Sequence, residues 1–133
     1  MRKGAVAITV MLLASTAQVA WAHEASTFRA CTVQAPGSCL TRGASFLYGD
    51  TVAIRGKVEP AHAGVVAKVL RRDPGSNTWT TLAERTVSER GRLRFAWETD
   101  KDDAVQDAPY LFRFKIPGHG SSNGTEVYVL YGE

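Results

Sequence analysis

Short segments of alternating apolar and polar residues, separated by turn-forming residues, most constrain the fold of this 133-residue chain. Segment 51–58 places Val52, Ile54 and Val58 on one face of an extended strand, and segment 110–116 does the same with larger apolar side chains. Alternation with a period of two is typical of a half-buried β-strand. From residue 44 onward no segment keeps a helical period for three turns, so we predict an all-β fold.

Seven strands are expected after residue 43. They cover 44–48, 51–58, 64–72, 78–88, 92–98, 110–116 and 125–131. Runs of Gly, Pro, Asn, Asp and Ser at 73–77 and 117–124 mark turns between them. This number and spacing of strands, without alternating helices, predicts an antiparallel β-sandwich rather than a parallel sheet.

The first 22 residues have the pattern of a secretory signal peptide. Two basic residues precede an apolar run over 5–14, and Ala20 and Ala22 are the small residues that signal peptidase requires. The apolar run is too short for a stable membrane span, which needs about 20 residues. We therefore predict cleavage before His23 and a secreted mature protein of residues 23–133.

Cleavage lowers the net charge of the protein. Sixteen basic residues become fourteen against thirteen acidic ones, because Arg2 and Lys3 leave with the signal peptide, and the formal charge falls from +3 to +1. A near-neutral domain gives no support for attraction to nucleic acid or an anionic membrane. Four arginines lie close together in the sequence: Arg85, Arg90, Arg92 and Arg94. Glu84 and Glu89 lie among them, so we expect a solvated strand and turn.

Two cysteines, Cys31 and Cys39, flank a turn signal at Pro36 and Gly37. An exported chain with an even number of cysteines is expected to oxidise them to a disulfide. We predict an N-terminal disulfide hairpin within 23–43, followed by the sandwich over 44–133. A metal-binding or redox pair is disfavoured, because the spacing is not Cys-x-x-Cys and no histidine is near in sequence.

Several residues of the predicted sandwich carry a family resemblance. They are Gly49-Asp50-Thr51-Val52, Gly56, Pro60, Gly64, Leu70-Arg71-Arg72, Trp79, Leu82, Gly91-Arg92, Phe95, Tyr110-Leu111-Phe112-Arg113, Val127 and Val129. Segment 44–131 thereby resembles the immunoglobulin-like or fibronectin-III-like modules common in secreted actinobacterial proteins. The resemblance implies an immunoglobulin-like sandwich with core and turn residues at these positions. It implies no particular activity, since one fold serves many functions.

His23 would become the N-terminus after signal cleavage. Its α-amine and imidazole together form a chelate suited to Cu(II), and some copper-binding periplasmic sandwiches and polysaccharide monooxygenases begin with histidine. A copper site needs further ligands, and the mature chain contains only His62, in a turn, and His119, in a glycine-rich loop. We keep a copper site at His23, with His119 as a candidate ligand, as the alternative to an incidental residue after the cleavage site.

The acidic segment 99–108 is a second candidate metal site. Asp100, Asp102 and Asp103 offer hard oxygen ligands suited to Ca²⁺. An EF-hand would need Gly and Glu at the places held by Val105 and Leu111, so that motif is excluded. A solvated loop is the default expectation, with a calcium site built from two loops as the alternative.

Trp79, Tyr128 and Tyr131 are candidate ligand-binding residues, because aromatic faces can stack on sugar rings. Trp79 follows a turn, and for it we favour a core position between the sheets over a place in a sugar platform.

The sequence contains no Gly-x-Ser-x-Gly, P-loop or dinucleotide-binding motif, so we predict that the protein is not an enzyme and needs no cofactor. The predicted function is a secreted binding or structural module of the cell envelope or extracellular space. Its expected partner is a protein or polysaccharide, with no nucleic acid and no membrane span after cleavage. The alternative function is an exported copper-binding protein that uses His23.

Overall fold

The computed structural model describes residues 27–132. The predicted signal peptide and His23 lie outside the described residues. The described chain contains no helix with the length and apolar character needed to cross a bilayer.

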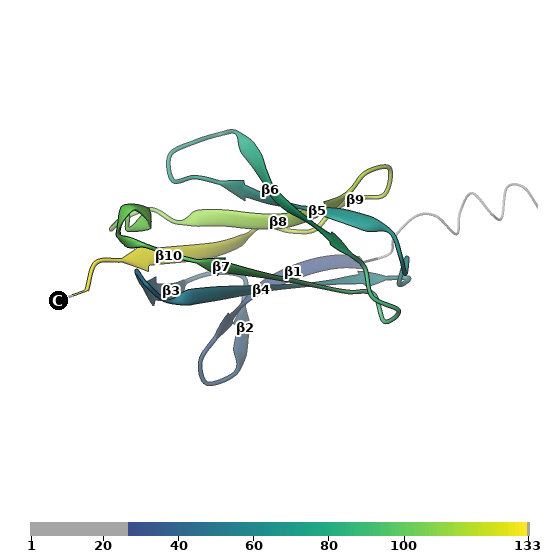
Figure 1. Cartoon of the computed structure of the whole chain (residues 1–133), viewed down its shortest axis with the longest axis horizontal. Coiled ribbons are helices and arrows are strands. Elements are labelled where there is room, and N and C mark those ends of the chain that lie inside the picture. Colours follow the sequence, from purple (N-terminus) through teal and green to yellow (C-terminus); the bar gives the residue numbers. More distant parts are fainter. Residues whose placement is uncertain (1–26, 133) are drawn as a thin grey trace, which may run out of the picture.

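Strands and turns account for almost all of the described chain (Figure 1). The elements are β1 (Thr27–Gln34), β2 (Ser38–Leu40), β3 (Ala44–Leu47), β4 (Thr51–Glu59), β5 (Val66–Arg72), β6 (Trp79–Thr86), β7 (Arg92–Glu98), the short 3₁₀ helix η1 (Lys101–Asp103), β8 (Tyr110–Ile116), β9 (Gly120–Ser121) and β10 (Thr125–Leu130). The all-β prediction is confirmed. After residue 43 the described chain forms eight strands where seven were expected, because the turn after β8 contains β9, and the predicted hairpin segment supplies β1 and β2.

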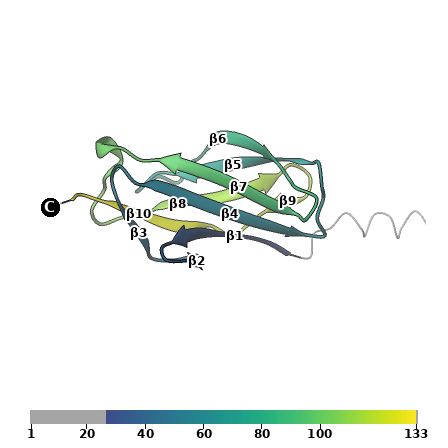
Figure 2. The same cartoon turned by 60° about the horizontal axis from the view of Figure 1, so that its bottom comes forward.

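The strands form two sheets that face each other (Figures 1 and 2). The four-stranded sheet has the order β2-β1-β4-β7, and the six-stranded sheet has the order β3-β10-β8-β5-β6 with β9 added to β8. Pairing is antiparallel throughout these sheets except between β3 and β10, which run parallel. The chain therefore changes sheets after β2, and β3 joins the six-stranded sheet beside the last strand.

The core lies between the sheets and follows the alternation seen in the sequence. Four residues of β8 alternate inward and are buried, as predicted: Tyr110, Phe112, Phe114 and Ile116. Trp97 of β7 packs against them, with ring centroids 4.9 Å from Tyr110 and 5.2 Å from Phe112. Gly56 of β4 allows the sheets to approach closely, because a Cβ at this position would lie 2.7 Å from Cδ2 of Phe114.

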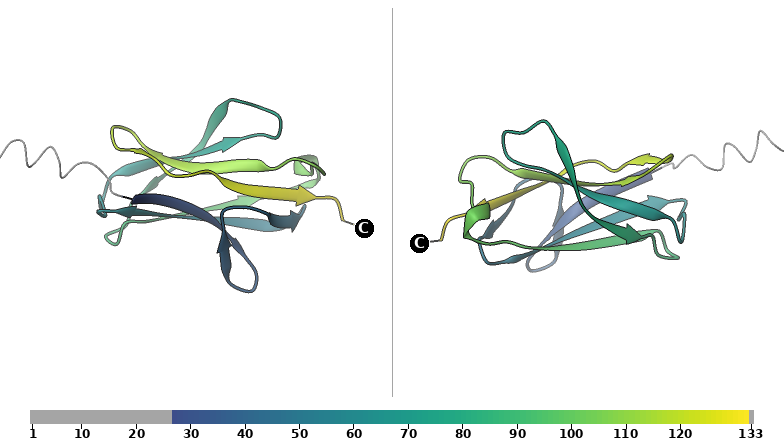
Figure 3. Two further views of the ribbon diagram at one scale, coloured as in Figure 1. Left: turned by 180° about the vertical axis from the view of Figure 1, so that it is seen from behind. Right: turned by 45° about the horizontal axis from the view of Figure 1, so that its top comes forward.

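The N-terminal segment is part of the sandwich as well as a hairpin. β1 pairs with β4 over six residue pairs, from Thr27 opposite Glu59 to Thr32 opposite Ile54. The predicted disulfide between Cys31 and Cys39 is confirmed, with a Cα–Cα distance of 5.3 Å. The hairpin that contains β2 projects from the sandwich on the side of the four-stranded sheet (Figures 1 and 3).

Candidate functional site

Basic side chains cover the outer face of the four-stranded sheet. The alternation that buries Ile54 and Val58 in β4 points Arg55 and Lys57 outward, and both are exposed. β7 does the same with its arginines. The strand register places Arg94 directly opposite Arg55.

A second row of cations crosses the same face. Lys57 of β4 lies opposite Arg92 of β7 on one side and opposite Arg29 of β1 on the other. Neighbouring strands are about 4.8 Å apart, so each row brings its charged side chains close together. Five exposed cations from three strands thus share one surface: Arg29, Arg55, Lys57, Arg92 and Arg94.

These five residues line a groove of about 450 Å³. Its floor is the outer surface of β1, β4 and β7, which is turned toward the viewer in Figure 2. Cys31 and Thr41, at the two ends of the disulfide hairpin segment, contribute to the lining on the β1 side. We call this feature the basic groove.

The described residues supply almost no compensating negative charge in the basic groove. Lys57 lies 3.9 Å from Glu59 in an ion pair whose side chains are 54% and 59% exposed, and such pairs contribute little. None of the four groove arginines has an ion pair with a carboxylate of residues 27–132. Like charges directly opposite each other on neighbouring strands are destabilising, so this arrangement costs folding energy.

Arg85 of β6 extends the basic surface beyond β7. It lines two smaller hollows together with Arg94. Its guanidinium lies 5.3 Å from the centroid of the Phe95 ring. Glu84 and Glu89 form no ion pair with an arginine of residues 27–132, although their positions in the sequence suggest one.

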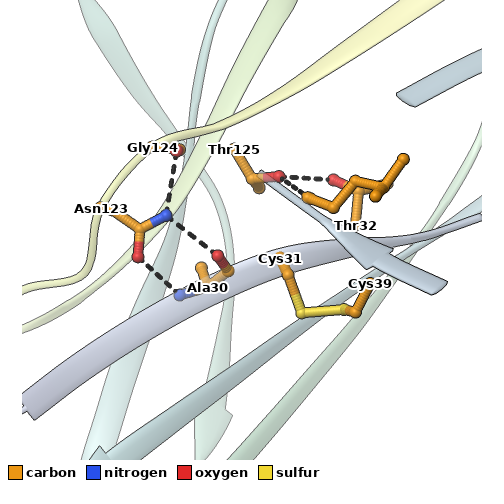
Figure 4. The surroundings of a disulfide bond; sticks show 8 residues. Ala30, Cys31, Thr32, Cys39, Asn123, Gly124 and Thr125 are labelled. Atoms are coloured by element: carbon orange, nitrogen blue, oxygen red, sulfur yellow. Dashed lines mark hydrogen bonds between the residues drawn. A yellow bond between two sulfur atoms is a disulfide. The ribbon is translucent and has the colours of Figure 1, made fainter. Parts of the chain in front are cut away.

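Hydrogen bonds from the start of β10 hold the β1 side of the groove in place (Figure 4). The Asn123 side chain accepts from the Ala30 backbone N–H and donates to the Ala30 carbonyl, both at 2.9 Å. The hydroxyls of Thr125 and the buried Thr32 lie 2.8 Å apart, and Thr125 also donates to the carbonyl of Leu40 in β2. These contacts join the hairpin to the six-stranded sheet, so β1 cannot shift independently of the core.

The chemistry of the basic groove is that of anion binding. Guanidinium groups present several N–H donors in a plane that matches carboxylate, sulfate or phosphate oxygens. Among the described residues, the groove lining includes no histidine, aspartate or glutamate that could transfer a proton, and its uncharged polar side chains are those of Thr41 and Asn123.

Sequence reasoning missed most of this surface. Of the five groove cations, the sequence analysis singled out Arg92 and Arg94. It expected both to lie in a solvated strand and turn. Arg29, Arg55 and Lys57 join them only through strand pairing. The available signal was the outward phase of β4 and β7, where every second residue is basic over Arg55–Lys57 and Arg92–Arg94.

Trp79 does not lie in the core between the sheets, contrary to the favoured expectation. It begins β6, opposite Arg72, which in turn lies opposite the outward-facing Leu111. The Arg113 guanidinium covers its ring at 4.2 Å from the centroid, and that of Arg72 lies at 5.5 Å. The register of β6 places this half-buried ring on the outer face of the six-stranded sheet.

The other two predicted aromatic residues lie elsewhere on the same sheet. Tyr128 is half-buried in β10, which β8 and β5 separate from the strand of Trp79. Tyr131 follows β10 and is 58% exposed. The three aromatic residues therefore sit on different parts of the sheet and do not form one row across it.

Local hydrogen bonds occupy the acidic segment. The Asp100 side chain accepts from the Asp102 backbone N–H, and the Asp103 side chain accepts from the Asp100 N–H, so two of the predicted calcium ligands cap η1. The buried Tyr110 hydroxyl donates to the Asp103 carbonyl at 2.7 Å. Burial, reinforced by the Asp103 carboxylate, raises the pKa of Tyr110. Within residues 27–132 no group of three or more His, Cys, Asp or Glu side chains is arranged to hold a metal.

The two histidines of the described chain lie together. The rings of His62 and His119 make an edge-on contact, with centroids 4.7 Å apart. Sequence reasoning placed them in separate loops and could not see that β4 and β8 bring these loops to one end of the sandwich.

A comparison of the chain with protein-family models and with curated proteins finds no match.

Proposed function

We propose that the protein is a secreted, non-enzymatic immunoglobulin-like module that binds an acidic polysaccharide of the cell envelope or extracellular space. The strand arrangement supports the immunoglobulin-like assignment. β1, β4 and β7 correspond to strands A, B and E of that fold, and β5, β8 and β10 correspond to strands C, F and G. The predicted signal peptide and the disulfide support an extracellular site of action.

The basic groove is the observation that carries this proposal. Its four arginines have no carboxylate partner among the described residues. Their mutual repulsion is therefore uncompensated and weakens the fold. An anionic ligand would supply the missing charge. Because the groove is partly open to solvent and has a volume of about 450 Å³, it suits a short stretch of a flexible chain of sugars.

The charge distribution favours a polysaccharide over a nucleic acid. The mature chain carries a formal charge of only +1, so the positive groove is offset by acidic residues elsewhere. Several of them lie in and around η1, at the end of the sandwich where β10 ends (Figure 1). A long, rigid and uniformly charged duplex would meet both regions, whereas a short polysaccharide segment contacts the groove alone.

Binding to defined polymers tests the proposal. We expect the protein to bind polygalacturonate or dextran sulfate, and not neutral dextran, in calorimetry at low salt. Binding should weaken as salt rises, because exposed charges are screened. The Arg55→Gln/Arg94→Gln variant should lose at least about tenfold in affinity, since each charged contact contributes about 1 kcal/mol or more.

A variant on the other sheet provides the matched control. Lys68 and Lys115 are also cationic neighbours on adjacent strands, but they lie on the outer face of the six-stranded sheet. Lys68→Gln/Lys115→Gln removes the same charge and should leave affinity within about twofold, because surface charges far from a site act only through a screened field. Equal losses in the two variants, or no binding to either anionic polymer, would refute the proposal.

A further inference from the structure

The exposed cations of the basic groove form two adjacent rows that run across the strands. One row consists of Arg29, Lys57 and Arg92, on β1, β4 and β7. The other row contains Arg55 and Arg94, each two residues away along its strand. Residues two apart on a strand are separated by about 6.8 Å, because a strand rises about 3.4 Å per residue. A chain laid between the two rows therefore meets cations on both of its sides.

The positive charge ends abruptly along the strand direction. Beyond the second row, the next outward-facing pair is Ala53 with Ala96, and the pair after it contains Glu98. Beyond the first row, β4 presents Glu59. Both glutamates are exposed. An anionic chain that ran along β4 or β7 would therefore leave the cations and meet a carboxylate in either direction.

The groove itself extends across the strands. Its lining includes only three consecutive residues from each of β1, β4 and β7. It reaches from Arg92 on β7 to Arg29 on β1, and then beyond β1 to Thr41. Figure 2 shows these three strands side by side on this face. Both the shape of the groove and the charge pattern favour a ligand that crosses the strands.

The separation of the strands sets the spacing of the cations. Neighbouring strands lie about 4.8 Å apart, so the backbones of Arg29, Lys57 and Arg92 follow one another at this interval. The sugar rings of a pyranose chain repeat at a similar interval. A chain with a carboxylate on every sugar can therefore present one carboxylate to each strand. A chain with a carboxylate on every second sugar would leave some of the cations without a partner.

We propose that the basic groove binds a polyuronate, which is a polysaccharide with a carboxylate on every sugar, and that the sugar chain lies across β1, β4 and β7 between the two rows. The polyuronate occupies the site of the proposed function, on which this inference rests. The four groove arginines suit this ligand, because a guanidinium group can donate two parallel hydrogen bonds to one carboxylate.

Two oligosaccharides with the same number of carboxylates test the charge spacing. One is hexagalacturonate, and the other is a hyaluronan oligosaccharide of twice the length, in which every second sugar carries a carboxylate. In calorimetry at low salt we expect hexagalacturonate to bind at least about fivefold more tightly, because it pairs more of the cations at once. Equal affinities, or tighter binding of hyaluronan, would overturn this inference and leave the proposed function standing. No binding of either oligosaccharide would refute both.

Single substitutions test the direction of the sugar chain. Arg29→Gln removes the exposed cation at the β1 end of the first row and should weaken hexagalacturonate binding at least about fivefold. Glu98→Gln, further along β7, should leave affinity within about twofold, because a chain that crosses the strands does not reach it.

Lys115→Gln is the matched control for Arg29→Gln. It removes one exposed cation from the outer face of the six-stranded sheet, and affinity should stay within about twofold. Thermal unfolding establishes that each variant is folded. Unchanged affinity in Arg29→Gln, or clearly tighter binding in Glu98→Gln, would contradict a chain that crosses the strands and would overturn the inference.

Discussion

The outer faces of the two sheets use arginine in opposite ways. On the six-stranded sheet, Arg72 and Arg113 are half-buried and lie over the ring of Trp79. On the four-stranded sheet, Arg55 and Arg94 are exposed and lie opposite each other. The first pair is held by contacts within the protein, whereas the second pair has neighbours of its own charge.

This difference separates arginines that stabilise the fold from arginines that are available to bind an anion. Cations that stack on an aromatic ring contribute to folding, because the ring attracts them and their apolar stems are covered. Cations that face one another oppose folding and gain from an anion supplied from outside. Substitutions that remove the contacts of Arg72 and Arg113 with Trp79 should therefore lower stability, whereas substitution of Arg55 or Arg94 should raise it.

The largest loss of stability is expected for substitution of Gly56, below the floor of the basic groove. Gly56→Ala would place a methyl group 2.7 Å from the Phe114 ring, so the sheets must move apart. We expect a loss of about 3 kcal/mol in unfolding free energy, the upper range for overpacking a core. Urea denaturation measures it. Ala53→Gly, at a half-buried position of the same strand, is the control and should cost about 1 kcal/mol or less. An equal loss in both variants would show that Gly56 does not set the spacing between the two sheets.

Removal of the disulfide is expected to cause the next largest loss of stability. Cys31→Ser/Cys39→Ser should lower the unfolding free energy by about 2.5 kcal/mol, from the chain entropy of so short a loop. The same change frees the hairpin beside the basic groove, so affinity for polygalacturonate should also fall. Calorimetry and thermal unfolding follow the two effects separately. Unchanged affinity would show that the hairpin does not shape the groove.

Trp79→Ala tests the other outer face. Loss of the ring removes the contacts with Arg72 and Arg113, and we expect a loss of about 2 kcal/mol in unfolding free energy from packing and cation–π interactions. Polygalacturonate affinity should stay within about twofold, because Trp79 is remote from the basic groove. A large fall in affinity with unchanged stability would instead support the predicted sugar platform.

The smallest expected effect is a gain in stability. Arg94→Gln removes the like charge opposite Arg55, and we expect a gain of about 0.5 kcal/mol in unfolding free energy together with weaker polymer binding. The gain should disappear at 1 M salt, where the Debye length is about 3 Å. A stability loss at low salt would contradict the view that these cations repel each other.

The sequence predicted which side chains of a strand point into the core better than it predicted how the strands pair. Alternation correctly placed Phe112 and Phe114 inside, and the short spacing of Cys31 and Cys39 correctly predicted their disulfide. Trp79 was assigned to the core wrongly, because its side depends on the register between β6 and β5. A one-residue change of register turns every side chain of a strand to the other face.

Long-range pairing also concealed the basic groove and the contact between the two histidines. Arg55 and Arg94 lie on strands far apart in the sequence, and the acidic residues near Arg94 suggested local compensation. His62 and His119 meet only because two loops close at the same end of the sandwich. Composition showed a nearly neutral chain, while the fold sorts its charges onto separate surfaces.

Mapping of the bound polysaccharide onto the two faces tests the central claim most directly. In NMR titration of the ¹⁵N-labelled protein with an oligogalacturonate, we expect backbone shifts confined to the groove strands around Arg29, Arg55 and Arg94 and to the adjoining hairpin. Residues around Trp79 and Arg113 should remain unperturbed. Shifts concentrated around Trp79, or spread evenly over both sheets, would contradict the assignment of the basic groove as the binding site.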